Sequence, residues 1–219
     1  MYTRLLDLHP FILCLTIVLA AKATYPAQQP TPPKPKPDYN PTQWTEIQKF
    51  DSTILLDLRY ATTNNFTKTT LYPSPRAFLR PNVAAALQKA QNLLQPKGYR
   101  LKLFDAYRPR PIQYKLWKIK PDPHYVTNPA KGSMHNRGMA VDLTIVDTNG
   151  NELNMGTDFD YFGERAHHDT NDLLPIPIQT NRKLLLQTMQ SCGFIPTRTE
   201  WWHYAFKGKL WDLSDWVWK

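Results

Sequence analysis

Hydrophobic and polar residues follow regular patterns along most of the chain from about residue 44 onward. Four segments alternate between apolar and polar positions or run apolar for several residues, which is typical of β-strands. These segments are residues 53–60, 99–107, 140–146 and 199–206. No internal repeat is visible, so the pattern favours one globular domain over an array of small units.

Helical periodicity is clearest between Asn82 and Gln95. The apolar residues of this segment recur every three or four positions and fall on one helical face: Val83, Leu87, Ala90 and Leu94. Asn82 is predicted as the N-cap, and Gly98 lies just beyond the end of the segment. Residues 111–119 and 181–191 are predicted as two further helices. Strands and helices are therefore mixed along the chain, as in an α+β domain.

The beginning of the chain differs in composition from the rest. Residues 11–21 form an apolar run that is short for a membrane span, and Ala21-Lys22-Ala23 has the small-x-small form of a signal peptidase site. We therefore predict a cleaved secretory signal peptide at residues 1–23, with an uncleaved membrane anchor as the alternative. Residues 24–43 are rich in proline and predict an extended spacer before a globular domain at residues 44–219.

Composition and charge narrow the class of protein. A chain of 219 residues with 42% hydrophobic and 12% aromatic residues can bury one ordinary core. The formal net charge is +9, and the sequence contains no nucleic-acid-binding motif. In an exported protein this charge favours loose contact with an anionic cell wall or membrane surface, and no nucleic acid partner is expected. A basic surface without any specific partner explains the charge equally well.

Two short segments contain the residue types of a zinc hydrolase. His135 and Asp142 lie seven residues apart, and Glu200-Trp201-Trp202-His203 adds a second imidazole and another acid. A catalytic zinc needs about three nitrogen or oxygen ligands from the protein and one position open for water. His135, Asp142 and His203 can supply these ligands, which leaves Glu200 free to move protons. Each segment alone occurs often by chance, and only the combination favours a zinc site.

The spacing between Glu200 and His203 places a condition on the strand that carries them. Side chains on a regular strand alternate between its two faces, so residues three positions apart point to opposite faces. Both side chains can reach one zinc ion only if the strand ends, bulges or twists near Trp201. We therefore predict an irregularity at this position.

Arg108 is a further candidate for the site. The segment Phe104–Pro109 ends a predicted strand and places this arginine directly before a proline. A fixed guanidinium can stabilise the oxyanion that forms when water attacks a carbonyl group. An ordinary structural salt bridge is the alternative role.

Taken together, these motifs resemble those of the vancomycin-resistance D-alanyl-D-alanine dipeptidase family, a branch of the zinc D,D-peptidases. The shared pattern is Ser-x-His-x-x-Gly-x-Ala-x-Asp followed by Glu-Trp-Trp-His, with Asp-Ala-Tyr-Arg-Pro upstream. The similarity covers most of the chain from about Tyr60 to Phe206. Segments specific to the dipeptidase branch are Arg59–Thr62, Asn65–Thr67, Asn154–Thr157, Phe159-Asp160, Glu164–His168 and Asn181–Leu185.

The resemblance implies a metal centre and its catalytic groups. The residues that match the ligands of one zinc ion per chain are His135, Asp142 and His203. Glu200 matches the family's catalytic acid/base, and Arg108 matches its transition-state arginine.

The resemblance also implies a small substrate pocket. Asp160 matches the acid that meets the free ammonium group of the dipeptide, with Asp158 as the weaker candidate. Ser133 and Tyr60 match residues that line the pocket. A longer peptide has an amide in place of this ammonium and would lose the charge contact with Asp160.

The activity implied by the resemblance is zinc-dependent hydrolysis of D-alanyl-D-alanine to two D-alanine molecules, in the turnover of peptidoglycan fragments. The implied fold is α+β, with a small central antiparallel sheet flanked by helices in the zinc D,D-peptidase (hedgehog/D,D-peptidase-like) architecture. A D,D-carboxypeptidase or cell-wall endopeptidase of the same superfamily and a non-catalytic zinc-binding module are the alternatives. With the predicted signal peptide, the expected location is the periplasm or cell envelope.

Histidines and tryptophans outside the ligand set receive structural roles. His167 and His168 invite a second metal site, but we favour a structural or supporting role because the catalytic site has its ligands without them. Trp201 and Trp202 are predicted to wall the pocket. The tryptophans near the C-terminus are predicted to pack the last segment on the core: Trp211, Trp216 and Trp218.

Overall fold

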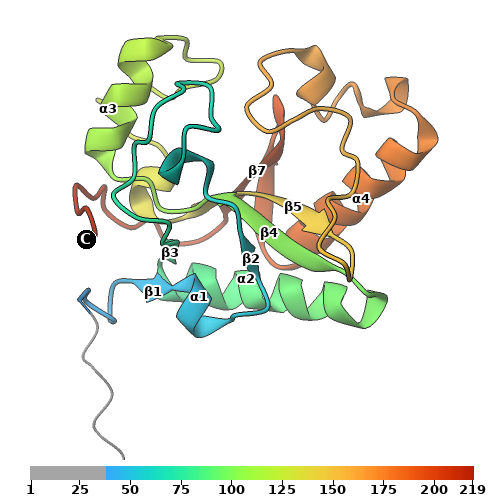
Figure 1. Ribbon diagram of the computed structural model, residues 1–219, viewed down its shortest axis with the longest axis horizontal. Coiled ribbons are helices and arrows are strands. Elements are labelled where there is room, and N and C mark those ends of the chain that lie inside the picture. The colour runs from blue at the N-terminus through green and yellow to red at the C-terminus, as the bar shows by residue number, and fades with distance from the viewer. Residues whose placement is uncertain (1–37) are drawn as a thin grey trace, which may run out of the picture. The chain divides into compact units, whose positions relative to one another are not determined.

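The computed structural model describes residues 38–219. The predicted signal peptide and residues 24–37 of the predicted spacer lie outside this range, so both stay predictions. Three long helices surround a central sheet: α2 (Pro81–Leu94), α3 (Arg110–Ile119) and α4 (Ile176–Ser191) (Figure 1). None of the helices between residues 38 and 219 has both the length and the apolar character needed to cross a membrane.

The central sheet has five strands. In spatial order they are β2 (Leu55–Leu56), β4 (Arg100–Asp105), β5 (Ala140–Val146), β7 (Glu200–Phe206) and β6 (Phe194–Thr197). The last four strands pair antiparallel, as expected, whereas β2 pairs parallel with β4 at one edge. The central strand β5 matches its predicted bounds, and every one of its residues is buried. The expected α+β fold is confirmed, with one parallel pair added.

The first predicted strand, residues 53–60, is much shorter in the structure. Only Leu55–Leu56 pair with β4, and the chain then makes a 3₁₀ turn at Arg59–Ala61. The carbonyl oxygen of Tyr60 accepts hydrogen bonds from the backbone N–H groups of Leu71 (2.8 Å) and Tyr72 (2.9 Å). The turn takes Tyr60 out of the sheet and places its buried side chain beside a pocket.

Helix α2 confirms the predicted apolar face. All four residues that the periodicity placed on one face are buried: Val83, Leu87, Ala90 and Leu94. The predicted N-cap is wrong by two positions, because the helix begins at Pro81 and Arg80 is the N-cap. Proline suits the first helical position, where its missing N–H would have no intrahelical partner and its φ angle is already helical.

The remaining elements complete the domain. Helix α3 starts one residue before its predicted bound, and α4 starts at Ile176, well before residue 181. The prolines at the start of α4 obscure this beginning in the sequence, although the first turn tolerates proline. A small antiparallel pair, β1 (Thr45–Glu46) with β3 (Phe78–Leu79), and the short helix α1 (Ile47–Phe50) pack at one side.

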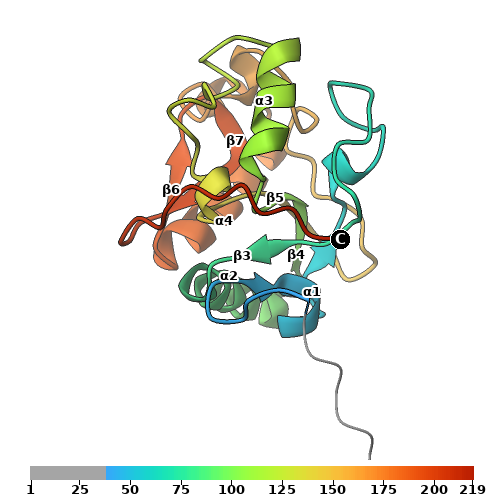
Figure 2. The same cartoon turned by 90° about the vertical axis from the view of Figure 1, so that its left-hand side faces the viewer.

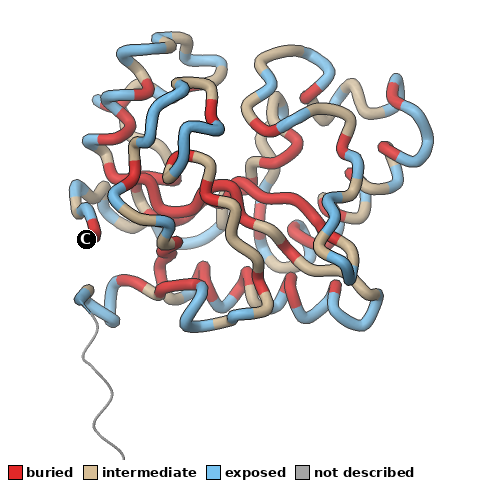
Figure 3. Tube along the Cα trace, in the orientation of Figure 1, coloured by how far each residue is buried: buried red, intermediate tan, exposed pale blue. Residues whose placement is uncertain are grey.

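The C-terminal segment packs on the core, as the tryptophan pattern predicted. It runs past α3 and β3 (Figure 2). The indole of Trp218 is buried, and Trp216 stacks on Tyr107 with ring centroids 5.9 Å apart. The Tyr107 hydroxyl donates to the carbonyl oxygen of Trp216 at 2.7 Å. Burial is densest along β4, β5 and the inner face of α2 (Figure 3), and this rigid centre carries the residues described next.

Candidate active site

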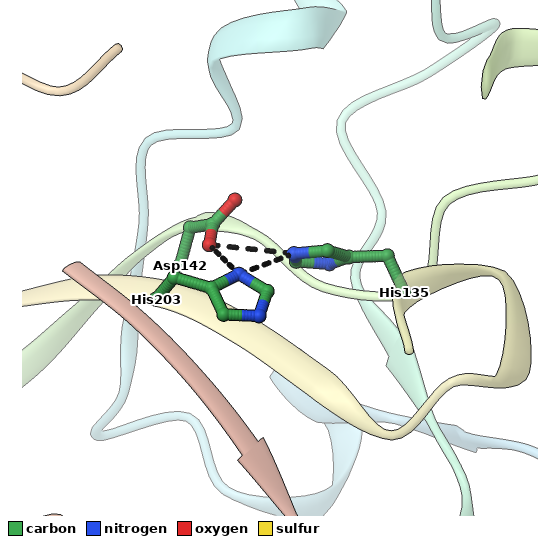
Figure 4. Close-up of side chains that lie close together, drawn as sticks. All are labelled: His135, Asp142 and His203. Carbon is green, nitrogen blue, oxygen red and sulfur yellow. Dashed lines mark hydrogen bonds and ion pairs between the residues drawn. The ribbon is translucent and has the colours of Figure 1, made fainter. Parts of the chain in front are cut away.

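Three side chains from distant parts of the chain meet beside the central strand (Figure 4). His135 lies in a 3₁₀ turn before β5, Asp142 lies on β5, and His203 lies opposite Asp142 on β7. The Nδ1 atom of His203 is 2.9 Å from Asp142 Oδ1 and 3.1 Å from His135 Nε2. One ligand atom from each residue lies within 4.8 Å of the others. The structure therefore brings the three predicted metal ligands together.

Hydrogen bonding fixes which atom of His135 faces this cluster. Its Nδ1 atom is 2.6 Å from the carbonyl oxygen of Ala106, so Nδ1 carries the hydrogen and donates it. The Nε2 atom lies 3.3 Å from Asp142 Oδ1 and is the ring nitrogen left to bind a metal. A metal-ligating histidine commonly donates its other ring nitrogen in this way. Two imidazole nitrogens and one carboxylate oxygen form a donor set that fits Zn²⁺.

The electrostatics of Asp142 agree with a cation site. Burial alone would raise the pKa of this carboxyl group, but the imidazoles of His135 and His203 hold the pKa well below its usual value. The residue is 3% exposed, so its charge is removed from water. A buried carboxylate that stays ionised needs cationic partners, and a divalent ion supplies them.

The predicted irregularity in the last strand is confirmed. Between β6 and β7, Pro196 pairs with Tyr204 but the next residue, Thr197, pairs with Glu200. Residues 201–203 therefore have no partners on β6, and the local twist lets Glu200 and His203 line the same pocket. Glu200 Oε2 lies 3.8 Å from His203 Nδ1. Burial raises the pKa of the Glu200 carboxyl group to about 7.

Arg108 is held in place from several sides. Its Nε and Nη2 atoms lie 2.9 Å and 2.7 Å from Asp105 Oδ2, and Nη1 donates to Gln113 Oε1 at 3.0 Å. The guanidinium also lies 5.0 Å from the centre of the Tyr60 ring and 3.6 Å from Asp142 Oδ2. A buried guanidinium fixed in this way is preorganised to stabilise negative charge.

The sequence interpretation missed Asp105, which orients Arg108. Its carboxylate is completely buried and also accepts hydrogen bonds from the Tyr72 hydroxyl (2.5 Å) and the backbone N–H of Ala106 (2.8 Å). The three-residue spacing from Asp105 to Arg108 was the available signal. The salt bridge that the sequence offered as an alternative role for Arg108 is present, and it serves to hold this arginine beside the ligand cluster.

Asp160 lies at another part of the same pocket, opposite Tyr60. The Tyr60 hydroxyl is 3.2 Å and 3.1 Å from the two carboxylate oxygens of Asp160. Burial, with help from the negative charge of Asp142, raises the pKa of Asp160 to about 8. Its backbone has a φ angle of +62°, in the left-handed region. Asp158, the weaker candidate, does not line this pocket.

All eight predicted site residues line one cavity of about 300 Å³. They are Tyr60, Arg108, Ser133, His135, Asp142, Asp160, Glu200 and His203. The sequence interpretation did not identify three further aromatic residues that line this cavity: Phe66, Tyr125 and Phe162. Phe162 makes edge contacts with Phe66 (centroids 5.2 Å apart) and lies 5.0 Å from Tyr125, so three separate loops meet there. The volume is at the lower end of the range for small-molecule sites, which suits a small substrate.

The tryptophans and histidines outside the ligand set lie in different places relative to the cavity. Trp202 lines the cavity as predicted, but Trp201 lines a neighbouring cavity, and its Nε1 donates to Thr157 Oγ1 at 2.7 Å. His167 and His168 do not line the active-site cavity. Burial lowers the pKa of His168 to about 4, so this histidine is neutral at physiological pH.

Comparison with known proteins agrees with this geometry. A protein-family model, Peptidase_M15, described as D-ala-D-ala dipeptidase, matches residues 42–215. The chain belongs to the D-ala-D-ala dipeptidase family. The predicted class of enzyme, a metallopeptidase of this family, is confirmed.

Similar proteins come from several bacteria. The D-alanyl-D-alanine dipeptidase of Escherichia coli is 40% identical over 163 residues, which are 74% of this chain and 84% of that protein. The D-alanyl-D-alanine dipeptidase of Enterococcus faecalis is 35% identical and covers 68% of this chain and 83% of its own. Among solved structures, VanYB in complex with D-alanine-D-alanine aligns with a TM-score of 0.40 and 18% identity, over 60% of this chain and 73% of that one.

Proposed function

We propose that this protein hydrolyses D-alanyl-D-alanine to two D-alanine molecules and binds one zinc ion per chain. The single observation that carries the proposal is the cavity of about 300 Å³, which joins the His135–Asp142–His203 cluster to Glu200, Arg108 and Asp160. Membership of the dipeptidase family supports the same activity. The proposed substrate places its carbonyl near the cluster and its ammonium near Asp160.

Each proposed role follows from the position of a side chain. His135, Asp142 and His203 would hold the zinc ion, which when bound would supply a Lewis acid for the scissile carbonyl and lower the pKa of a water molecule. Glu200, beside His203, takes a proton from the attacking water and returns it to the leaving nitrogen. Arg108 donates to the oxygen on which negative charge develops.

Asp160 and Tyr60 set the preference for a free dipeptide. The carboxylate of Asp160 pairs with the substrate ammonium, while the Tyr60 hydroxyl keeps this carboxylate turned into the cavity. Ser133 lines the same cavity at a different loop. A longer peptide would bring an uncharged amide to Asp160 and more atoms than the narrow cavity accepts. This argument favours a dipeptidase over a D,D-carboxypeptidase or endopeptidase.

Metal analysis and a panel of D- and L-dipeptides test the activity directly. We expect one zinc per chain and turnover of D-alanyl-D-alanine, with weak or no turnover of the L,L-dipeptide and of an N-acetylated D,D-dipeptide. Glu200→Gln should retain zinc and lose turnover, because the proton acceptor is removed and the ligands are not. Comparable hydrolysis of the blocked peptide would instead support the carboxypeptidase alternative, and zinc binding without any turnover would support the non-catalytic module.

We further propose that the protein is exported and acts on cell-wall fragments in the periplasm or cell envelope. The short apolar run and the Ala21-Lys22-Ala23 site support export. Cleavage would remove Arg4, Lys22 and Asp7 and change the net charge from +9 to +8, which supports loose contact with an anionic surface. Cell fractionation with N-terminal sequencing tests this. A mature chain that begins near residue 24 supports the proposal, and a full-length chain in the cytoplasm contradicts it.

A further inference from the structure

The segment that carries Asp160 is a long connection between β5 and α4. We call residues 154–168 the Asp160 loop (Figure 1). No strand pairing holds this loop, and its only regular turn is the 3₁₀ turn Glu164–Ala166. The loop is therefore held only by its contacts with neighbouring elements. Asp160 sits in its middle with a left-handed backbone, which residues other than glycine rarely adopt. The surrounding structure must therefore hold this conformation.

Arg182 on α4 attaches both ends of this loop. Its Nε donates to the carbonyl oxygen of Met155 at 2.7 Å, before Asp160. Its Nη2 and Nη1 donate to the carbonyl oxygens of Arg165 (2.8 Å) and His167 (3.1 Å), after Asp160. One planar guanidinium thus joins the two ends of the loop, and all three of its nitrogens donate a hydrogen bond. We call these three hydrogen bonds the Arg182 clasp.

The environment of Arg182 is unusual for a charged side chain. The residue is 2% exposed, and among residues 38–219 no carboxylate forms an ion pair with it. Burial lowers the pKa of its guanidinium to about 10. Burying a charge without a counter-charge is costly, and backbone carbonyl oxygens compensate only in part. A methionine would avoid the buried charge but would leave the three carbonyl oxygens without these donors, so the arginine serves to make these contacts.

Two further contacts fix the same loop to the elements of the site. Asn181, next to Arg182, donates from Nδ2 to the carbonyl oxygen of Asn154 at 3.0 Å. Trp201 on β7 donates to Thr157 Oγ1, and Glu200 directly precedes Trp201 on this strand. The loop is therefore tied to α4 and to the strand that carries Glu200 and His203. Its position relative to the ligand cluster is set by these ties.

We propose that Arg182 is a positioning residue that sets where Asp160 meets the ammonium group of the substrate. The inference rests on the proposed dipeptidase function and deepens it. Arg182 does not line the cavity, so it touches neither substrate nor metal and acts only through the loop. The metal ligands lie on β5, β7 and the His135 turn, outside the loop, so zinc binding does not depend on the clasp.

The test compares two substrates that differ only in the ammonium group. D-alanyl-D-alanine carries it, and N-propionyl-D-alanine has hydrogen in its place. The ratio of kcat/KM for these two compounds measures the contact with Asp160. For Arg182→Met we expect the ratio to fall at least about tenfold, mainly through a higher KM for the dipeptide, since a misplacement of about 1 Å can cost about 100-fold. Zinc content and kcat for the propionyl compound should change little.

Two further variants make the result decisive. Lys183→Met removes one positive charge from the adjacent, exposed position of α4 and should leave the ratio unchanged. Arg182→Lys keeps the charge but has one nitrogen in place of three. Compared with Arg182→Met, we expect it to restore the melting temperature more fully than the kcat/KM ratio of the two compounds. Melting curves of the zinc-loaded variants show whether each is folded at the assay temperature.

Each outcome has a distinct meaning. A fall in the ratio with Arg182→Met and not with Lys183→Met supports the clasp. An equal loss of kcat/KM for both compounds, or an unchanged ratio in a folded Arg182→Met protein, overturns it, because Arg182 would then be only structural or unimportant. If the unmodified protein does not hydrolyse D-alanyl-D-alanine at all, the proposed function fails first. If Arg182→Met is unfolded, the ratio for Arg182→Lys decides between the same two results.

Discussion

The buried pair of Asp105 and Arg108 gives a quantitative prediction. Asp105→Asn keeps the shape of the side chain but removes its charge, so the guanidinium of Arg108 loses its closest counter-charge. Asp105 is fully buried, and its pairing atoms lie 2.7–2.9 Å from the guanidinium nitrogens. Breaking a buried pair by removing one partner costs about 3–5 kcal/mol. For a protein of this size that corresponds to a fall in melting temperature of about 6–20 °C.

An exposed ion pair serves as a matched control. It shows how much of the loss of stability comes from the burial of the charges and how much from the loss of an ion pair as such. Arg110 and Asp215 form an equally close pair, with two contacts of 2.7 Å, but their side chains are 34% and 57% exposed. Asp215→Asn is therefore expected to lower the melting temperature much less than Asp105→Asn, because solvent screens an exposed pair. Both variants are compared by thermal and urea unfolding at the same free zinc concentration. A loss for Asp105→Asn no larger than that for Asp215→Asn would refute the reasoning.

The double variant tests the cause of the loss. If the cost comes from an uncompensated charge on Arg108, then Arg108→Met in the Asp105→Asn background should restore part of the lost stability. If instead the cost comes from the hydrogen bonds that Asp105 accepts from Tyr72 and Ala106, the double variant will be less stable than Asp105→Asn. Turnover should fall in every variant that lacks the oriented Arg108.

Two further predictions concern the metal and the cavity. Removal of zinc by a chelator should lower the free energy of unfolding by about 4 kcal/mol relative to zinc at 1,000 times its dissociation constant, and Asp142→Asn should lose this response to zinc. An unfolding curve that does not respond to zinc would argue against the ligand cluster. Phe162→Ala removes the ring that contacts Phe66 and Tyr125 and should raise kcat/KM for D-alanyl-D-alanyl-D-alanine relative to the dipeptide. An unchanged ratio in the folded variant would show that these aromatic residues do not limit substrate length.

Local patterns in the sequence predicted the elements that carry the metal ligands. The strand at residues 140–146 was predicted from its short, mainly apolar run, and in the structure its whole length is buried. The irregularity near Trp201 was predicted because two side chains three residues apart had to reach one ion. Both predictions use only the period of a strand and the geometry of a metal site. The identity of the ligands followed from residue chemistry and from the family resemblance.

The remaining features depend on contacts between distant segments, which a single sequence does not encode locally. The expectation that Trp201 and Trp202 both wall the pocket is wrong for Trp201, whose indole donates to Thr157 and lines the neighbouring cavity. The parallel pairing of β2 depends on where the chain leaves the sheet before Tyr60. The clasp formed by Arg182 joins residues that lie 15 to 27 positions away along the chain. No local period reports such contacts.

The charges of the cavity lead to a last prediction about protons. Asp142 lies among the metal ligands and Asp105 pairs with Arg108, whereas among residues 38–219 Asp160 forms no ion pair with a cationic side chain and Glu200 has only His203, 3.8 Å away. Burial raises the pKa of Asp160 to about 8 and that of Glu200 to about 7. At pH 7 the Asp160 carboxyl group is therefore mainly protonated before ligands bind. The substrate ammonium and the zinc ion both favour its ionised form, so binding must release a proton.

Calorimetry in buffers of different ionisation enthalpy measures this release. We use the Glu200→Gln background, which prevents turnover and removes the second titrating carboxyl group. Adding zinc and then D-alanyl-D-alanine at pH 7 should release, over the two steps, about one proton more from this protein than from the same protein with Asp160→Asn. The difference should vanish above pH 9, where Asp160 is already ionised. Equal proton release at pH 7 would mean that Asp160 does not meet the incoming positive charge, and the proposed basis for choosing a free dipeptide would be wrong.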